Sequence, residues 1–340
     1  MKKVPLLYYI VAGMIGCISI IFLHNISAKS SNINPVNQLN DIPLTQEGCG
    51  YKLSRLHGYK YIQPLLFITQ ECESEKYNSL KSQIINYLNT CSNADPASKV
   101  SVYLCDLTKE GSWMGINTEE AFCPGSLLKV VLLITHLKAA ERDPSILDKK
   151  VKFNLTKNIT PPTQHFNSKT IIPGHTYTVK ELLKYMIAYS DNYATWLLNN
   201  YVDKESLKAT FTDFGFAKPD LMDPRYTINT RDYSYFMRAL YNAGYLHISS
   251  SEFALSLLTE SDFNEGIVKG IPSSVVVAHK FGETGSSTEH QLHESAIVFL
   301  NNNPYLLTIM TKGRTIETQP EILRNISNMT YNFMSSQKPI

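Results

Sequence analysis

The sequence predicts an α+β fold in which one sheet is built from both ends of the chain and helices occupy the middle. Strand-like segments gather in residues 99–116 and again in residues 275–311, whereas helical periodicity prevails between them. A strand at either end of a helical stretch favours a sheet that the chain leaves, to build a helical part, and later rejoins.

The composition is that of a folded protein with a sizeable core. Of the 340 residues, 43% are hydrophobic and 11% are aromatic, which excludes a generally disordered chain. The 32 Lys and Arg nearly balance the 30 Asp and Glu, and no run of five basic residues occurs. The electrostatic footprint of a nucleic-acid-binding protein is therefore missing, and we expect no nucleic-acid partner.

The N-terminus predicts export. Lys2 and Lys3 precede an uncharged run, Val4–Leu23, that is about as long as a helix needs to cross a bilayer. The positive-inside rule keeps the lysines in the cytoplasm and places the rest of the chain on the periplasmic or extracellular face. We interpret residues 1–28 as an anchor in the inner membrane, with a signal peptide cleaved after Ala28 as the alternative.

Residues 29–71 are predicted to be a linker and an N-terminal extension that precede the main domain at 72–340. The part up to residue 47 is rich in Ser, Asn and Pro, and residues 48–71 have no assigned shape. Five cysteines follow the apolar segment without any Cys-x-x-Cys pair, so disulfides are their expected use after export. Pairing stays open, with Cys49–Cys72 proposed because these two bracket one compact segment.

The first elements of the main domain are one helix and two strands. A helix is expected from Glu73, because apolar residues recur on one face at Tyr77, Leu80, Ile84, Tyr87 and Leu88. The strand Lys99–Asp106 follows, with Ser112–Ile116 as its hairpin partner.

The later elements are a helical subdomain at about 126–260 and then three strands with a closing helix. A helical pattern runs from Ser126 to about Val202 and includes a capping box at Thr178–Glu181. The remaining elements are expected at Asp232–Tyr241 and Ser251–Thr259 (helices), at Val275–Gly282, Ser295–Leu300 and Tyr305–Thr311 (strands), and at Glu321–Met334 (helix).

The segment that begins at Pro124-Gly125-Ser126 predicts an activated serine. Ser126 lies on the first turn of an apolar helix, and Lys129 is the only charged residue before Lys138. Burial favours the neutral amine, and the spacing of three residues sets the amine on the same face as the hydroxyl. A neutral amine beside a serine is an activated nucleophile, whereas a snorkelling lysine and a plain N-cap serine are the structural alternative.

Two further segments carry polar residues where a ligand could bind. Ser190-Asp191-Asn192 follows a helix with a well-formed apolar face, and it offers a proton relay and an amide clamp, or else an ordinary turn between helices. The run Val275–Ala278 leads into His279-Lys280-Phe281-Gly282-Glu283, where a glycine after a lysine lets a ligand approach the backbone.

These three motifs, in this order, resemble the class A β-lactamase and penicillin-binding serine hydrolase superfamily, whose signature is Ser-x-x-Lys, Ser-Asp-Asn and Lys-Thr-Gly. The resemblance implies a five-stranded antiparallel sheet with flanking helices, an inserted all-helical domain, and an active site between them. It implies the following roles: Ser126 as the acylated nucleophile, Lys129 as its base, Ser190 as the proton relay, Asn192, Lys280, Phe281 and Gly282 as substrate-binding residues, and the backbone N–H groups of Ser126 and Glu283 as the oxyanion hole.

Two departures from the family pattern bear on specificity and turnover. Phe281 replaces the usual Thr or Ser, and strand alternation sets it opposite Lys280, where its ring is expected to make the pocket more apolar. No Glu-x-x-Leu-Asn pattern follows Asn200, so the residue that would activate the deacylating water is not evident. Asp220 and Asp223 are the only carboxylates in that loop-like stretch.

The predicted activity is therefore an exported serine hydrolase that cleaves β-lactams or similar amides through an acyl-enzyme. The alternatives are a D,D-peptidase that acts on D-Ala peptides and that β-lactams trap, and a penicillin-binding scaffold with little turnover. No cofactor or metal is expected, because His290, His293 and Glu294 match no standard zinc motif and are interpreted as residues at a strand end.

Overall fold

The computed structural model describes residues 49–337, apart from 96–97, 109–110, 155–163, 167, 217–225, 287 and 302. The apolar segment at 4–23 and the linker at 29–47 lie outside the described residues. In the part that the structure describes, no helix combines the length and the apolar character needed to cross a membrane. The described residues cluster as one compact unit.

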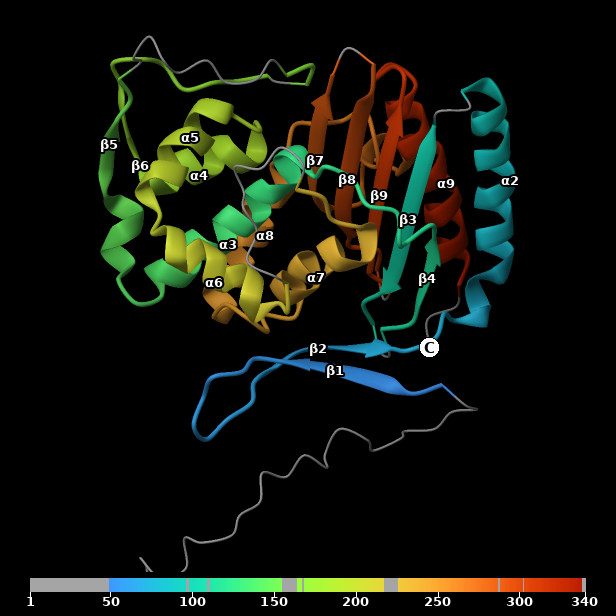
Figure 1. The fold of residues 1–340 in the computed structure, drawn as a ribbon, viewed down its shortest axis with the longest axis horizontal. Coiled ribbons are helices and arrows are strands. Elements are labelled where there is room, and N and C mark those ends of the chain that lie inside the picture. Colours follow the sequence, from blue (N-terminus) through green and yellow to red (C-terminus); the bar gives the residue numbers. More distant parts are fainter. Residues whose placement is uncertain are drawn as a thin grey trace, which may run out of the picture. The chain divides into compact units, whose positions relative to one another are not determined.

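The centre of this unit is a five-stranded antiparallel sheet with the strand order β4-β3-β9-β8-β7, which confirms the predicted fold class. Strands from the two ends of the chain meet where β3 pairs with β9 (Figure 1). The edge strand β7 starts two residues later and ends three residues later than the predicted strand at Val275–Gly282. The strands are β3 (Lys99–Asp106), β4 (Trp113–Ile116), β7 (Val277–Gly285), β8 (His290–Val298) and β9 (Tyr305–Gly313).

Strand alternation supplies both faces of the sheet with apolar side chains. On β3, Val102 and Leu104 enter one core cluster, and Tyr103 and Cys105 enter the other. The first cluster lies under α2 (Asn78–Ala94) and α9 (Gln319–Ser336), which cover one face of the sheet (Figure 1). The second cluster joins the opposite face to the helical part of the molecule.

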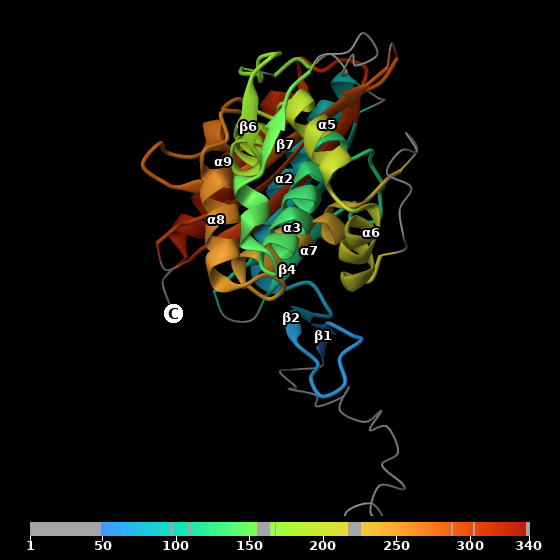
Figure 2. The same ribbon diagram turned by 90° about the vertical axis from the view of Figure 1, so that its left-hand side faces the viewer.

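The helical part is built around the apolar helix α3, which other helices surround (Figure 2). The capping box is present as predicted: Thr178 Oγ1 accepts from Glu181 N, and the Glu181 carboxylate accepts from Thr178 N. The all-helical prediction needs one correction, because short strands pair at 150–152 and 176–178. The elements are α3 (Leu128–Ala140), β5 (Lys150–Lys152), β6 (Thr176–Thr178), α4 (Val179–Ala188), α5 (Asn192–Tyr201), α6 (Lys204–Asp213), α7 (Thr230–Tyr241) and α8 (Ile248–Thr259).

The described part of the segment 48–71, which had no assigned shape, forms a β-hairpin. Strand β1 (Tyr51–Arg55) pairs antiparallel with β2 (Leu65–Gln70), and the proposed disulfide between Cys49 and Cys72 closes the open end. The hairpin is fixed to the rest of the unit by apolar and polar contacts. Leu56, Leu66 and Phe67 are buried in the larger core cluster, and Trp113 Nε1 donates to Gln70 O at 2.7 Å. We call Tyr51–Gln70 the N-terminal hairpin.

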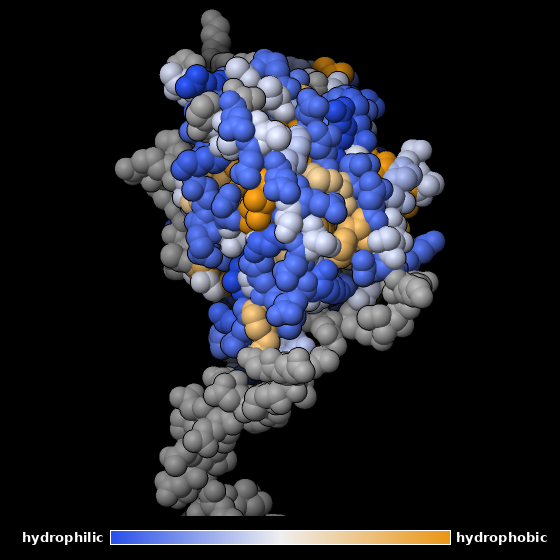
Figure 3. Space-filling view, turned by 90° about the vertical axis from the view of Figure 1, so that its right-hand side faces the viewer, coloured by the Kyte–Doolittle hydropathy of each residue, from blue (hydrophilic) through white to orange (hydrophobic). Residues whose placement is uncertain are grey.

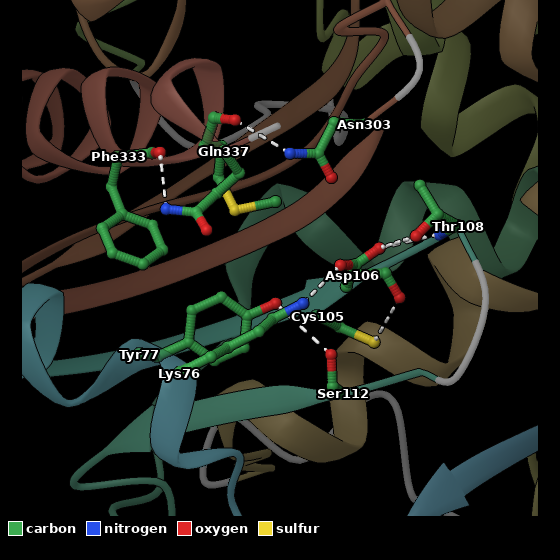
Figure 4. Close-up of polar contacts among 10 residues, drawn as sticks. Lys76, Tyr77, Cys105, Asp106, Thr108, Ser112, Asn303, Phe333 and Gln337 are labelled. Carbon is green, nitrogen blue, oxygen red and sulfur yellow. Dashed lines mark hydrogen bonds and ion pairs between the residues drawn. The ribbon is translucent and has the colours of Figure 1, made fainter. Parts of the chain in front are cut away.

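A polar cluster fixes the start of α2 to the end of β3. Lys76 Nζ donates to Asp106 Oδ2 at 2.8 Å, and Asp106 Oδ1 accepts from the backbone N–H and the hydroxyl of Thr108 (Figure 4). These hydrogen bonds hold the pKa of Asp106 below its usual range despite its burial. Beside them, the Tyr77 hydroxyl lies 3.4 Å from Ser112 Oγ.

The outer face formed by α2 and its neighbours is mostly hydrophilic, and apolar residues appear on it only in small separate groups (Figure 3). This is the pattern expected of an amphipathic helix whose apolar stripe faces the sheet. Tyr77, Leu80, Ile84 and Leu88 are buried, as the sequence periodicity predicts.

Replacement of Arg238 by Met is expected to loosen the N-terminal hairpin. The buried guanidinium donates to Thr69 Oγ1 and to Ile68 O, and it stacks on the ring of Phe67. Loss of these charge-assisted hydrogen bonds should lower the free energy of unfolding by about 3 kcal/mol. Urea unfolding and limited proteolysis within the hairpin measure the effect.

The matched control is Arg314→Met. Arg314 is exposed and pairs with Asp95 at 3.7 Å, so its loss should change stability by less than about 0.5 kcal/mol. Equal effects of the two substitutions would show that Arg238 does not hold the hairpin.

Candidate active site

Ser126 lies in a short 3₁₀ turn, η2 (Gly125–Leu127), that leads directly into α3. The residue is buried, with 9% of its surface exposed. Gly125 adopts a left-handed φ of 52°, and a Cβ there would lie 2.5 Å from Glu283 O. Only glycine fits this position, because both the backbone conformation and the contact with β7 exclude a side chain.

Gly282 brings β7 against the same turn from the other side. A Cβ on Gly282 would lie 2.4 Å from Pro124 O and 2.9 Å from Leu127 N. The prediction that this glycine admits a ligand is therefore corrected: the backbone around Ser126 fills the space. As a result, the backbone of Glu283 lies beside the turn that carries Ser126.

Lys129 connects α3 to the motif at 190–192. Its Nζ lies 2.6 Å from Ser190 O, 3.2 Å from Ser190 Oγ and 2.8 Å from Asn192 Oδ1. Burial lowers the pKa of this amine to about 7, although the nearby carboxylates of Asp191 and Glu283 oppose the shift. Near neutral pH a substantial fraction of Lys129 is therefore an uncharged base.

Ser190 lies between two lysines. Its φ of 52° is left-handed, which is rare for a residue other than glycine, and it directs both the carbonyl and the hydroxyl of Ser190 toward Lys129. Lys280 Nζ donates to the same hydroxyl oxygen at 2.9 Å. Burial and the neighbouring Lys129 lower the pKa of Lys280. Because both amines lie within 3.2 Å of one oxygen, repulsion disfavours the state in which both are charged.

Asp191, the middle residue of the motif, positions the loop and had no predicted role. Its buried carboxylate accepts from Ile171 N at 2.8 Å, from Thr170 Oγ1 at 3.1 Å and from Tyr193 N at 2.8 Å. The last bond caps α5. Asp191 therefore joins Ser190 and Asn192 to the segment around residue 170.

The segment 164–166 also reaches the site, although no sequence pattern indicates it. Gln164 Nε2 donates to Ser190 O at 3.1 Å. The Glu283 carboxylate accepts from His165 N at 2.9 Å and lies 3.3 Å from His165 Nδ1. The side chain of Glu283 thus fixes this segment, whereas the predicted role of Glu283 concerned only its backbone.

The ring of Phe281 is placed differently from the expected pocket wall. Alternation does set it opposite Lys280, but the ring is fully buried and stacks on Phe263 with centroids 4.4 Å apart. Lys280 Nζ lies 4.1 Å from the centroid of the Phe281 ring. The ring therefore forms an apolar wall behind the amine and presents no exposed surface to a ligand.

The histidines of β8 include one that supports the site. His293 is buried: its Nε2 lies 2.9 Å from Cys123 O, and its Nδ1 accepts from Thr311 N. Burial lowers its pKa to about 4, so the ring is neutral and donates through Nε2. It fastens the segment before Ser126 to the sheet.

Asp220 and Asp223, the carboxylates of the loop-like stretch after Asn200, lie outside the described residues.

Comparisons with known proteins agree with this arrangement. The model of the beta-lactamase enzyme family matches residues 79–334. The chain belongs to the beta-lactamase enzyme family. Among curated proteins, none matches the sequence.

Solved structures related to this family share the fold. A class A β-lactamase from Bacteroides cellulosilyticus is 18% identical with a TM-score of 0.65, and the match covers 78% of this chain and 100% of that one. A mutant of PBP-A, solved as an acyl-enzyme complex with penicillin G, is 20% identical with a TM-score of 0.62, over 75% of this chain and 96% of that one. At these identities the likeness establishes the fold.

Replacement of Gly282 by Ala is expected to force β7 away from the turn of Ser126. The overlap with backbone atoms should lower the free energy of unfolding by about 2 kcal/mol. Urea unfolding measures the loss. Gly50→Ala is the control, since its nearest neighbour is the flexible end of the Glu71 side chain, which can move aside. Unchanged stability of Gly282→Ala would contradict the close approach.

Proposed function

We propose that the protein is an exported serine hydrolase that forms an acyl-enzyme on Ser126 with β-lactams or similar amides. The observation that carries the proposal is the buried Lys129 amine, whose pKa is about 7 and which is bonded to both Ser190 and Asn192. Membership of the beta-lactamase family supports the reaction class.

Acylation begins when the neutral amine of Lys129 takes the proton of the Ser126 hydroxyl. The oxygen attacks the amide carbonyl carbon, and the negative charge moves to the carbonyl oxygen. The backbone N–H groups of Ser126 and Glu283 are the proposed donors to that oxyanion, since β7 lies against the turn of Ser126.

Collapse of the tetrahedral intermediate breaks the C–N bond and needs a proton on the leaving nitrogen. In this proposal Ser190 donates its hydroxyl proton to that nitrogen and recovers one from the Lys129 ammonium, whose Nζ is 3.2 Å away. Lys280 holds the Ser190 oxygen in place from the other side. The products of this step are the ester on Ser126 and the free amine.

Substrate recognition is assigned to the polar groups around the same crevice. Asn192 offers its amide to a substrate carbonyl, and Lys280 offers positive potential to a substrate carboxylate. Phe281 supports Lys280 from behind through its buried ring. The PBP-A structure with penicillin G supports a β-lactam as the first probe.

The rate of deacylation distinguishes the candidate activities. A reporter cephalosporin that is hydrolysed steadily would support a β-lactamase, and a stoichiometric burst would support a D,D-peptidase that the drug traps. A penicillin-binding scaffold would show no turnover. The missing Glu-x-x-Leu-Asn pattern favours slow deacylation.

Export is the remaining part of the proposal. The paired lysines and the apolar run at 4–23 support a location on the periplasmic or extracellular face. A β-lactam or a D-Ala peptide of the cell wall would meet the enzyme there.

Replacement of Ser126 by Ala is expected to abolish covalent labelling by penicillin. The wild-type chain should gain the mass of one penicillin in an intact-mass spectrum, and the variant should gain none because the nucleophile is absent. Ser256→Ala, on the exposed side of α8, is the control and should label fully. Labelling that survives in Ser126→Ala would assign the nucleophile elsewhere.

Replacement of Lys129 by Met is expected to slow acylation by about 10³-fold, because the general base is lost. In the wild type, the acylation rate should fall as the pH drops below about 7, since the amine is then protonated and cannot accept the serine proton. Stopped-flow labelling across pH measures both effects.

The control for this substitution is Lys184→Met, which removes only an exposed ion pair with Glu260. It should keep the wild-type rate and the wild-type pH profile. A Lys129→Met enzyme that retains the pH-dependent step near 7 would exclude Lys129 as the base.

A further inference from the structure

The N-terminal hairpin concentrates the exposed apolar side chains of the molecule. Among the described residues, twelve large apolar side chains are exposed, and half of them belong to this twenty-residue hairpin. Figure 1 shows it at one end of the compact unit, below α7 and the lower ends of β3 and β4. The six are Leu53, Tyr59, Tyr61, Ile62, Leu65 and Ile68.

The exposed residues lie on the two strands and on the loop that joins them. Leu53 and Ile68 are paired directly across the two strands, so their side chains share one face. The loop between the strands carries the most exposed members: Tyr61 is 84% exposed, Ile62 is 58% exposed and Tyr59 is 52% exposed. Soluble monomeric proteins rarely expose a group of large apolar side chains, and a patch of this kind marks an interaction site.

The charged residues of the hairpin are all basic. Residues 51–70 contain no Asp or Glu, although the whole chain is nearly neutral. Lys52, Arg55, His57 and Lys60 are all exposed, and Lys60 lies over the ring of Tyr61 at 4.9 Å. Tyrosines, isoleucine and lysines together on one exposed loop are the side chains that bind at the interface of an anionic bilayer.

The hairpin is held rigidly enough to present this loop. Its inner face is buried against the core through Leu66 and Phe67, and Arg238 binds the backbone of β2. A Cβ on Gly244 would lie 2.6 Å from Leu66 O, so the turn after α7 abuts the strand. These contacts fix β2 to the domain while the loop residues Tyr59, Tyr61 and Ile62 are exposed.

We propose that the N-terminal hairpin docks onto the surface of an anionic lipid bilayer, with Tyr59, Tyr61 and Ile62 inserted at the headgroup level and the basic residues over anionic headgroups. The hairpin follows the predicted membrane segment by fewer than thirty residues, so the lipid surface is its nearest partner. This surface is separate from the residues assigned to the reaction.

The test uses the full chain with a specific protease site inserted among residues 30–44. The protein is reconstituted into vesicles of phosphatidylcholine with 30% phosphatidylglycerol, or of phosphatidylcholine alone, and is then cut. Sedimentation measures how much of the folded fragment stays on the vesicles. We expect at least about tenfold stronger retention on the anionic vesicles, with release as salt rises.

Two hairpin variants and one control isolate the effect. The double variant Tyr61→Ser with Ile62→Ser, and the single variant Lys60→Glu, should each weaken retention about tenfold. Ile248→Ser changes an equally exposed apolar residue on α8 and should leave retention unchanged. Penicillin labelling of each released fragment verifies that it is folded, or circular dichroism does so if the chain does not label.

Three outcomes would overturn the proposal. The first is complete release of the wild-type fragment from both kinds of vesicle, and the second is equal retention on both. The third is a dimer of the fragment that the hairpin variants abolish, which would assign the face to a second copy of the chain. None of these outcomes depends on whether Ser126 is acylated.

Discussion

The buried amine of Lys129 is the constraint around which the rest of the structure is arranged. An amine inside an apolar helix is costly unless it is neutral or has polar partners, and this one has three oxygen atoms within 3.2 Å. Those partners come from Ser190 in the loop between α4 and α5 and from Asn192 at the start of α5, and that loop is itself held by the Asp191 carboxylate. The helical part and the sheet edge are thus joined through a small polar cluster inside an apolar core.

The second requirement is that the backbone of the Ser126 turn and the backbone of β7 approach each other closely. Gly125 and Gly282 let the turn of Ser126 and the edge strand β7 meet without side chains between them. His293 and Gln291 of β8 hold the backbone of Cys123, which lies two residues before that turn. The serine is consequently fixed by sheet, turn and helix together, which is the preorganisation that the proposed role of Ser126 needs.

Much of the fold could be predicted from the sequence, because the spacing of apolar residues indicates which side chains are buried. The strand Lys99–Asp106 and the capping box of α4 are found where the pattern places them. The N-terminal hairpin was missed since its exposed face is apolar, which hides the alternation that marks a strand. Gln164 and the side chain of Glu283 were missed because their contacts join residues more than 25 positions apart, and no local pattern encodes such a pairing.

Helix α3 separates the turn of Ser126 from the N-terminal hairpin. It starts at the turn of Ser126 and ends where Lys138 binds the carbonyl of Tyr245, next to the turn that abuts the hairpin. Its 13 residues span about 20 Å. A molecule seated on lipid through the hairpin, as proposed, would have its serine and its lipid contact near opposite ends of α3.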